Sequence, residues 1–462
     1  MTSNANTPDL ADYILVKQAA RECGLPCPNS LYPAIRSGLI ESRKKDNLTW
    51  IKRGSLLAYL AQKRTGLGSE NALINQQPTP ALYPNPFHSQ TLTVDIKALR
   101  NQIGRWLSIA PEDADVVDVT LAVFNSNKLP GDPVWLELVD ASGAGKTELL
   151  RAFRGHPDCY SISKLTENSL VSGYREATSN RKKVADDPSL LPKLDGKVLI
   201  IKDLSPILAM RAESRSAILG ALRDAYDGIV DEGKGNIGKV SYQSKFSVIA
   251  GCTLAVDRSD SVDKELGERF IRYRARGNQS LAKIKKSLDN LGQDVPMRAE
   301  IEKIVTQFLA SLPKMFPLIP PAMKSKLAEL ADFTAKARSP VARDRAGDLQ
   351  YHPRPEVGTR LAKELGKLLV SLAIVRGKLE PDEEDFKTIQ RIADDCLPPN
   401  RLLILNQLRA QGKMRQSEIE KAVGLPDRTC RRVLDDLKVL GITDCEIPMY
   451  EENSKRWFLA TH

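Results

Sequence analysis

Hydrophobic and polar positions along the chain form two recurring patterns. Short, almost continuous apolar runs at 134–139, 198–201 and 247–253 predict buried strands, and 158–163 predicts a further strand. Apolar residues spaced three or four apart predict helices, which we expect at 96–107, 114–124, 215–226, 280–291, 299–312, 321–336 and 358–378. Strands that alternate with helices are typical of an α/β fold with a parallel sheet. We therefore expect a central α/β domain followed by a helical region.

The first apolar run leads into a glycine-rich turn that carries the main chemical signal. The turn reads Asp-Ala-Ser-Gly-Ala-Gly-Lys-Thr from 140 to 147, and helix-forming residues follow it. This order matches the Walker A phosphate loop, GxxxxGK[ST], except that Asp140 replaces the first glycine. Backbone N–H groups would face phosphate oxygens, Lys146 would reach the β- and γ-phosphates, and the Thr147 hydroxyl would bind Mg²⁺. We therefore expect ATP and Mg²⁺ as cofactors, with a nucleotide-binding set of Ser142, Gly143, Ala144, Gly145, Lys146, Thr147 and Glu148.

A second signal follows the apolar run at 198–201, where Asp203 comes after the predicted strand. A Walker B strand carries an aspartate at its carboxyl end because Mg²⁺ prefers a carboxylate beside the Thr147 hydroxyl. The glutamate that usually follows this aspartate is absent here. Either Asp203 serves the metal and another carboxylate, such as Glu213 or Glu148, activates water, or Asp203 is itself the base. We favour the first interpretation.

Further glycine and polar residues at informative positions follow this strand. Glycine and asparagine between short β-prone pieces at 227–242 predict a hairpin with Lys234 and Lys239 near its tip. The next buried strand ends in Thr253, and Arg269 lies in a Leu-Gly-Glu-Arg-Phe stretch. This arrangement resembles AAA+ ATPases, and within them the minichromosome maintenance (MCM) type. The resemblance implies a hexameric ring of identical subunits that hydrolyses ATP and moves on or remodels DNA.

The same resemblance implies roles for individual residues. Thr253 takes the position of the first sensor, where the family more often has asparagine. Arg269 takes the position of the arginine finger, which stabilises charge on the nucleotide of the neighbouring subunit. Lys234 or Lys239 would be the hairpin lysine that touches DNA.

The helical region at 281–398 looks like the lid of that family. Its strongly amphipathic helix at 358–378 carries Arg360 at the position of the second sensor, and Arg354 is the alternative. The predicted catalytic set is therefore Lys146, Asp203, Thr253, Arg269 and Arg360, with Thr147 and Asp203 as the metal ligands.

The first 65 residues form a compact basic unit. A helix that starts near Tyr13, a turn, a second short helix, two strands around a basic tip and a further helix are expected in this order. The layout resembles the winged helix domains of the excisionase and MerR type, which implies DNA binding. A small protein-interaction domain is the alternative. The candidate DNA contacts, in the major groove and on phosphate, are Arg36, Arg43, Lys44 and Lys45.

The last unit, at 399–462, has a similar layout. Helical stretches are followed by two short strands, at 441–443 and 456–459. This resembles another winged helix, whose exposed recognition face would carry Arg428, Arg431 and Arg432. Because the unit has little net charge, docking of a protein is an equal alternative to DNA binding.

Composition changes this picture only slightly. The formal net charge of +10 over 462 residues indicates a polyanionic partner such as DNA. No apolar run approaches the roughly 20 residues of a membrane span, so no membrane partner is expected. The 7 cysteines are scattered without a metal-ligand spacing, which argues against zinc and fits the reduced thiols of a cytoplasmic protein.

Together these signals predict an α/β AAA+ core flanked by two small winged helix-turn-helix domains. The expected parts are a winged helix at 1–65, a linker at 66–94, an ATPase core at 95–280, a helical lid at 281–398 and a second winged helix at 399–462. We expect an ATP-dependent DNA helicase or translocase of phage or mobile-element replication. One alternative is an ATP-switched DNA-bound assembly factor, such as a helicase loader or transposition regulator, and the missing glutamate favours it somewhat. The other is a transcription regulator gated by ATP.

Overall fold

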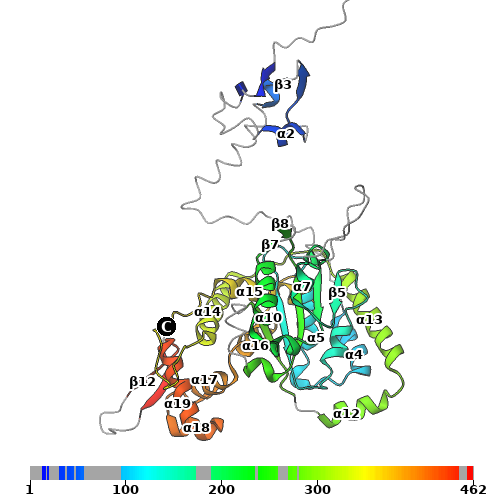
Figure 1. Cartoon of the computed structure of the whole chain (residues 1–462). Helices are drawn as coiled ribbons and strands as arrows, with labels where there is room; N and C mark the ends of the chain where they lie inside the picture. Colours follow the sequence, from blue (N-terminus) through cyan, green and yellow to red (C-terminus); the bar gives the residue numbers. More distant parts are fainter. Residues whose placement is uncertain are drawn as a thin grey trace, which may run out of the picture. The chain divides into compact units, whose positions relative to one another are not determined.

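The computed structural model describes residues 13–16, 18–19, 31–36, 39–45, 48–56, 95–172, 189–234, 238–258, 269–277, 280–446 and 455–460. The chain divides into two compact units, Met1–Gln90 and Thr91–His462 (Figure 1). The linker predicted at 66–94 lies outside the described residues. In the described part of the chain, no helix combines the length and the apolar character needed to cross a membrane.

The larger unit is built on a five-stranded parallel sheet with the strand order β10-β4-β9-β6-β5. The strands are β4 (Trp135–Val139), β5 (Cys159–Ile162), β6 (Val198–Ile201), β9 (Ser247–Cys252) and β10 (Phe270–Arg274). The apolar runs are thus confirmed as buried parallel strands, and helices on both faces explain why they are apolar throughout. All five strands end on one side, which we call the carboxyl edge, and begin on the other, the amino edge.

Alternate side chains of β4 enter two hydrophobic layers, as the period of a strand requires. Leu136 and Leu138 enter a layer shared with the α4–α5 and α13–α16 helices. Trp135 and Val139 enter a layer on the other face, which α10 covers. The long helices are α4 (Ile96–Trp106), α5 (Val116–Ser126), α10 (Ala212–Tyr226), α12 (Ser280–Asp289), α13 (Asp294–Ser311), α14 (Pro321–Arg338), α15 (Thr359–Val375) and α16 (Glu383–Asp395). The short ones are η2 (Pro111–Asp113), α6 (Lys146–Arg151), α7 (Glu167–Leu170), α8 (Leu191–Leu194), α9 (Ser205–Leu208) and η3 (Leu254–Arg258).

The helices predicted after the sheet are confirmed, with small shifts of their ends. The largest shift is in α13, which begins at Asp294 rather than at 299. Pro296 is tolerated there because N–H groups in the first turn of a helix have no acceptor within the helix. The α15 helix is buried along most of its length and packs against α5. The helical region therefore shares its hydrophobic core with the sheet.

Buried ion pairs tie α15 and α16 to the helices before the sheet. Asp118 of α5 is fully buried and accepts hydrogen bonds from Arg100 of α4 and from Arg376, which follows α15. Arg376 also donates to Asp385 of α16 at 2.8 Å. Each buried charge in this network is thus matched by an opposite charge, as low-dielectric surroundings demand.

A hairpin leaves the amino edge after α10. It consists of β7 (Ile229–Lys234) and β8 (Gly238–Gln243), paired antiparallel. The hairpin predicted at 227–242 is therefore confirmed. Figure 1 shows it at the opposite end of the larger unit from α12.

The last part of the larger unit has a hydrophobic cluster of its own around Trp457. Its elements are α17 (Pro399–Gln411), β11 (Met414–Arg415), α18 (Gln416–Val423), α19 (Asp427–Val439), β12 (Thr443–Glu446) and β13 (Arg456–Leu459). The three strands form a sheet with the order β11-β13-β12. Arg401 of α17 anchors this part by donating to the carbonyl oxygens of Ala337 and Ser339 at 2.8 and 2.7 Å.

The smaller unit differs from the sequence expectation at its start. Its elements are β1 (Tyr13–Leu15), α2 (Tyr32–Arg36), β2 (Ser42–Lys45) and β3 (Leu48–Lys52), and the sheet has the order β1-β3-β2. The helix predicted from Tyr13 is wrong in its first residues, because Tyr13 begins a strand that pairs with Lys52 of β3, whereas Val16, Gln18 and Ala19 are helical. A short apolar run fits either state, and pairing within the folded unit decides between them.

Candidate phosphate site and its apolar cavity

The glycine-rich turn between β4 and α6 has the backbone that a phosphate loop needs. Gly143 and Gly145 adopt φ angles of 76° and 94°, in the region that residues with a Cβ atom disfavour. Gly145 is the N-cap of α6, so Lys146 and Thr147 are the first residues of that helix. The glycines predicted for nucleotide binding are therefore the residues that allow the chain to turn here.

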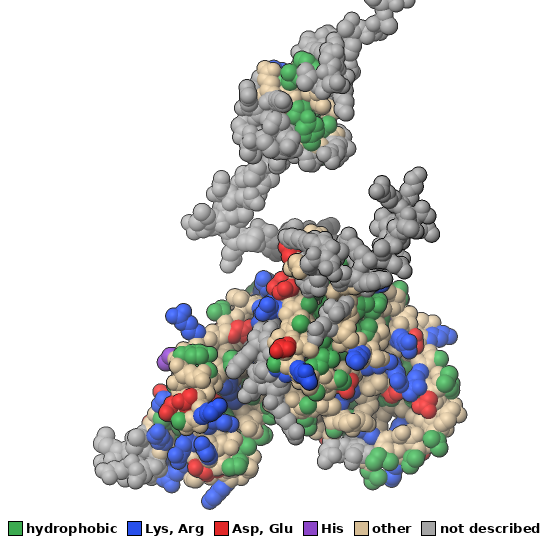
Figure 2. All heavy atoms as spheres, viewed as in Figure 1, with side chains coloured by type: hydrophobic (Ala, Val, Ile, Leu, Met, Phe, Trp, Pro, Cys, Tyr) green, Lys and Arg blue, Asp and Glu red, His purple; other side chains and the backbone are tan. Residues whose placement is uncertain are grey.

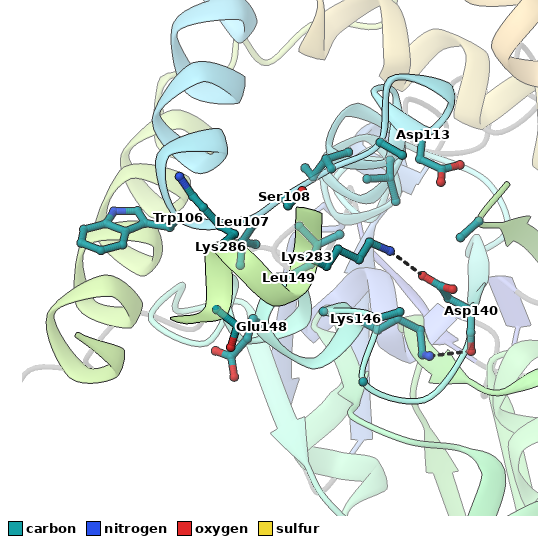
Figure 3. Close-up of a pocket in the computed structure, with 18 of the residues that line it drawn as sticks. Trp106, Leu107, Ser108, Asp113, Asp140, Lys146, Glu148, Leu149, Lys283 and Lys286 are labelled. Atoms are coloured by element: carbon teal, nitrogen blue, oxygen red, sulfur yellow. Dashed lines mark hydrogen bonds and ion pairs between the residues drawn. The ribbon is translucent and has the colours of Figure 1, made fainter. Parts of the chain in front are cut away.

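Lys146 is folded back onto its own loop. Its Nζ atom donates to the backbone oxygen of Asp140 at 2.7 Å (Figure 3). It also donates to the backbone oxygen of Ala141 at 2.6 Å. Burial lowers the pKa of Lys146, while the nearby carboxylates of Asp140 and Asp203 oppose this shift. Carbonyl oxygens are neutral acceptors, and an anionic phosphate is a stronger acceptor for an ammonium group. Lys146 therefore stays next to the loop through hydrogen bonds to carbonyl oxygens, and a bound anion can replace these acceptors.

Asp140, which departs from the Walker A pattern, has two contacts of its own. Its Oδ1 atom accepts a hydrogen bond from the N–H of Ala141 at 2.7 Å. Its Oδ2 atom lies 3.5 Å from Nζ of Lys283 in α12 (Figure 3). The aspartate therefore links the phosphate loop to α12, a contact that the sequence pattern alone did not predict.

Three polar residues at the carboxyl edge lie next to the loop. Because β9 lies between β4 and β6, Thr253 follows the strand between the phosphate loop and Asp203. The Ser205 hydroxyl is 3.0 Å from the Thr253 hydroxyl and accepts a hydrogen bond from the Thr253 N–H at 3.2 Å. Asp203 accepts from the N–H of Ser205 at 2.9 Å. The structure thus brings Lys146, Asp203 and Thr253 together, with Ser205 as a connecting residue that the sequence analysis missed.

A cavity of about 330 Å³ opens beside the phosphate loop. One wall is the loop itself, from Gly143 to Lys146, and another is the segment 106–110 between α4 and η2. A third wall is α12. The apolar part of the lining includes Trp106, Leu107, Ile109, Leu149 and Met297. An apolar cavity that continues into a phosphate loop has room for a nucleoside next to its phosphates.

Glu148 lines the same cavity, but its carboxylate already accepts hydrogen bonds from two arginines. Its carboxylate accepts two hydrogen bonds of 2.9 Å from Arg298 and one of 2.6 Å from Arg151. Burial would raise the pKa of Glu148, but these two arginines hold it below its usual value. Glu148 therefore anchors α6 to α13, and a carboxylate with so low a proton affinity is a poor base. The other candidate base, Glu213, is exposed in the first turn of α10.

Arg269 and Arg360 lie away from this site, at the amino edge. Arg269 precedes β10, whose first residue pairs with the first residue of β4. Its guanidinium donates to Asp227 at 3.1 Å, and Arg360 donates to Glu356 at 2.9 Å. Burial and the nearby Arg360 lower the pKa of Arg269, while Asp227 opposes this shift. The two predicted arginines are thus brought together, but at the opposite edge from Lys146.

A buried carboxyl group lies near Arg360. Glu364 of α15 is 1% exposed and accepts a hydrogen bond from the hydroxyl of Tyr226. Burial raises the pKa of Glu364 to about 7, against the opposing hydrogen bond from Tyr226 and the charges of Arg338 and Arg360. This group therefore changes charge close to neutral pH.

The structure describes the side chains of some predicted DNA-binding residues and only the backbone positions of others. Lys234 and Lys239 lie in β7 and β8, in neighbouring pairs at the far end of the hairpin. Three arginines are exposed on α19: Arg428, Arg431 and Arg432. The alternative second-sensor residue, Arg354, is exposed before α15. Side chains outside the described part of the structure are those of Lys234, Lys239, Arg36, Arg43, Lys44 and Lys45.

Comparison with known proteins gives little further information. No protein-family model matches the chain, and no curated protein matches it. Among solved structures that match is one described as a "putative ATPase" from Cytophaga hutchinsonii ATCC 33406. It is 14% identical, with a TM-score of 0.41, and the match covers 71% of this chain and 93% of the other. A likeness this weak identifies neither a fold family nor an activity.

Proposed function

We propose that this protein binds ATP with Mg²⁺ at the carboxyl edge of the sheet and hydrolyses it. The observation that supports this most strongly is the conjunction of a glycine turn at positive φ, Lys146 beside it and an apolar cavity continuous with both. The loop and Lys146 bind the phosphates, and the cavity takes the base and ribose. The adjacent Asp203 and Thr253 complete the site.

The residues at this edge also fit a magnesium ion. The Thr147 hydroxyl and the Asp203 carboxylate are hard oxygen donors of the kind that Mg²⁺ prefers, and both lie next to Lys146 in sequence or in space. When bound, the ion neutralises charge on the phosphate oxygens. Lys146 stabilises the charge that develops on the transferred phosphoryl group. Ser205 links Thr253 to Asp203, because its hydroxyl contacts the Thr253 hydroxyl and its backbone N–H donates to the Asp203 carboxylate.

Arg269 and Arg360 act on the nucleotide of a neighbouring subunit under this proposal. Both are at the amino edge, so they are remote from the phosphate loop of their own chain. A guanidinium supplied by a neighbour makes hydrolysis depend on assembly. We therefore propose a ring of identical subunits, hexameric as the AAA+ resemblance implies.

The proposed substrate of the ring is DNA. The order of elements from α17 to β13, with three arginines exposed on α19, supports a winged helix at the C-terminal end of the described chain. The hairpin that carries Lys234 and Lys239 supports a contact with a DNA strand in the channel of the ring. We propose an ATP-dependent helicase or translocase in the replication of a phage or mobile element.

A forked-duplex unwinding assay with ATP tests this proposal. We expect strand separation by the wild type and none by Lys146→Ala, because the variant loses the ammonium group that binds the phosphates. ATP hydrolysis without strand separation on any DNA geometry would instead favour the assembly factor. The absence of a second acidic residue after Asp203 is the observation that supports this second candidate.

A further inference from the structure

The ion pair between Asp140 and Lys283 lies in the wall of the nucleotide cavity, and we call it the cavity pair. Both residues line the cavity, and their side chains are only 19% and 22% exposed. The charged atoms are 3.5 Å apart, and Figure 3 shows the two side chains pointing towards each other. A ligand that enters the cavity therefore meets both partners of this ion pair.

The other carboxylates in the described lining of the cavity are paired differently. Arg391 pairs with Asp113. Arg298 pairs with both Glu148 and Asp294. Neither arginine lines the cavity. The cavity pair differs from these ion pairs because its lysine faces the same space as the ligand, so a bound anion can compete for it.

The cavity pair also lies next to the amino group that binds the phosphates in the proposed site. The Nζ atom of Lys146 donates to the backbone oxygen of Asp140 at 2.7 Å. Burial is the main cause that lowers the pKa of Lys146, and the positive charge of Lys283 adds to this shift, while the charge of Asp140 opposes it. The three charged groups are thus close enough to interact, and a phosphate held by Lys146 experiences the charges of both members of the pair.

Polar contacts hold α12 beside the cavity. Its side chains Leu281, Ile284 and Leu288 are 64%, 56% and 65% exposed, and none of the three packs into the hydrophobic core of the described chain. Figure 2 shows hydrophobic side chains gathered at that end of the unit. The cavity pair links α12 to the phosphate loop, and Asn290 donates to the backbone oxygen of Trp106 at 2.8 Å. The position of α12 therefore depends on polar contacts more than on apolar packing.

We propose that Asp140 stands in for a phosphate group in the empty site, and that bound ATP takes Lys283 over from it. The carboxylate holds Lys283 at the loop until a triphosphate, which carries more negative charge, becomes the stronger acceptor. Asp140 thereby lowers the affinity for ATP, and Lys283 connects the bound phosphates to α12. This inference rests on the proposed function, and it explains why an aspartate in place of the first Walker A glycine regulates the same site.

A double-mutant cycle on ATP affinity tests this exchange of partners. Asp140→Asn removes the charge but keeps an oxygen that accepts from the N–H of Ala141, so the loop backbone is preserved. We expect this variant to bind ATP about tenfold more tightly than the wild type, because it loses both a competing ion pair and a repulsive charge. In the Lys283→Ala background, the same substitution should tighten binding only about twofold, because only the repulsion is then removed.

Two variants on α12 control for the change in net charge. Asp289→Asn and Lys285→Ala make the same changes of charge at exposed positions outside the cavity lining. Both should bind ATP as the wild type does. An Asp140→Asn variant with wild-type affinity would overturn the proposal, as would an equal gain from Asp140→Asn with and without Lys283.

Hydrogen exchange of α12, measured without ATP and at saturating ATP, gives a structural readout. Asp140→Asn and Lys283→Ala both break the cavity pair, so the backbone amides of α12 should exchange faster than in the wild type when ATP is absent. ATP should restore the protection in Asp140→Asn, where Lys283 can bind a phosphate, but not in Lys283→Ala. Equal restoration in both variants would contradict the exchange of partners.

Other roles of Asp140 give different results in the same assays. Weaker ATP binding by Asp140→Asn in the presence of Mg²⁺ alone would assign the carboxylate to the metal and overturn the proposal. Lost hydrolysis at unchanged ATP affinity would assign it to the activation of water, with the same consequence. Failure of Lys146→Ala to weaken ATP binding would instead overturn the proposed function. A normal loss in Lys146→Ala, together with additive effects in the cycle, would overturn only the inference about Asp140 and Lys283.

Discussion

The two edges of the parallel sheet differ in the hydrogen-bond acceptors that Lys146, at one edge, and Arg269 and Arg360, at the other, contact. At the carboxyl edge, Lys146 donates to two backbone carbonyl oxygens. At the amino edge, Arg269 and Arg360 are paired with the carboxylates of Asp227 and Glu356. An anion that arrives at the first edge replaces neutral acceptors, whereas an anion at the second edge must displace an ion pair.

This difference assigns separate tasks to the two edges. Under the proposed function, the carboxyl edge binds the phosphates in a single copy of the chain, because Lys146 and the glycine turn belong to the same chain. Under the same proposal, the arginines of the amino edge act only when a neighbouring copy brings an acceptor that carries more negative charge than the carboxylates of Asp227 and Glu356. Binding and hydrolysis should therefore respond separately to mutation.

The largest expected effect comes from the amino edge. Arg269→Ala should lower the ATP hydrolysis rate of the assembled protein by about 10³-fold, because an arginine supplied by a neighbour stabilises the transition state to this extent. ATP affinity of the monomer should not change. The measurement is steady-state hydrolysis alongside equilibrium binding, with Arg223→Ala as the control, since Arg223 is half exposed on the adjacent α10 helix. Wild-type hydrolysis by Arg269→Ala would remove this residue from the mechanism.

The second effect concerns the carboxyl edge. Lys146→Ala should weaken ATP binding by about 100-fold, because it removes charge-assisted hydrogen bonds to phosphate. Isothermal titration of the monomer measures this directly. Lys283→Ala is the informative comparison, because it removes a neighbouring lysine that pairs with Asp140, and it should have a smaller effect. Equal affinities for wild type and Lys146→Ala would contradict the account of this edge.

A third effect is on stability and arises at Glu364. Because the pKa of this buried carboxyl is raised to about 7, its contribution to stability is present at low pH and is lost as the pH rises through 7. Glu364→Gln cannot ionise, so we expect it to be more stable than the wild type at pH 8 by about 2 kcal/mol. Urea unfolding at pH 5 and pH 8 checks this, and the exposed Glu380→Gln serves as the control. An unchanged pH dependence in Glu364→Gln would show that another group is responsible.

The smallest effect should come from the apolar wall of the cavity. Leu107→Ala should weaken ATP binding by about threefold, because it removes part of a half-buried apolar contact to the nucleoside. Binding of inorganic triphosphate, which has no nucleoside, should stay the same. Equal losses for both ligands would place the base elsewhere.

The sequence predicted the sheet and the phosphate loop because both depend on local patterns. Apolar runs identify buried strands, as β4, β6 and β9 confirm, and the positive φ angles of Gly143 and Gly145 agree with the predicted glycine turn. The first strand of the smaller unit was predicted as a helix, since Tyr13 and its neighbours fit both states and only pairing with β3 decides. Local pattern is thus a sufficient guide only where one state is clearly favoured.

The remaining parts of the site depend on contacts between distant segments. The cavity wall at 106–110 and the α12 helix reach the phosphate loop from segments that precede and follow the sheet. Ser205 joins Asp203 to Thr253 across almost 50 residues, and no spacing in the sequence indicates that. The sequence shows the amphipathic pattern of α12 but not where its apolar face points. Only the fold shows that it faces solvent.

Hydrogen exchange with and without ATP tests the central claim most directly, because it reports on both edges in one experiment. We expect ATP to protect the backbone amides of the phosphate loop at 141–147 and of the cavity walls at 106–110 and 283–291. In the monomer, the amino edge around Tyr226 and Arg269 should show no change. Protection of the amino edge alone, or of neither edge, would contradict the assignment of the nucleotide site.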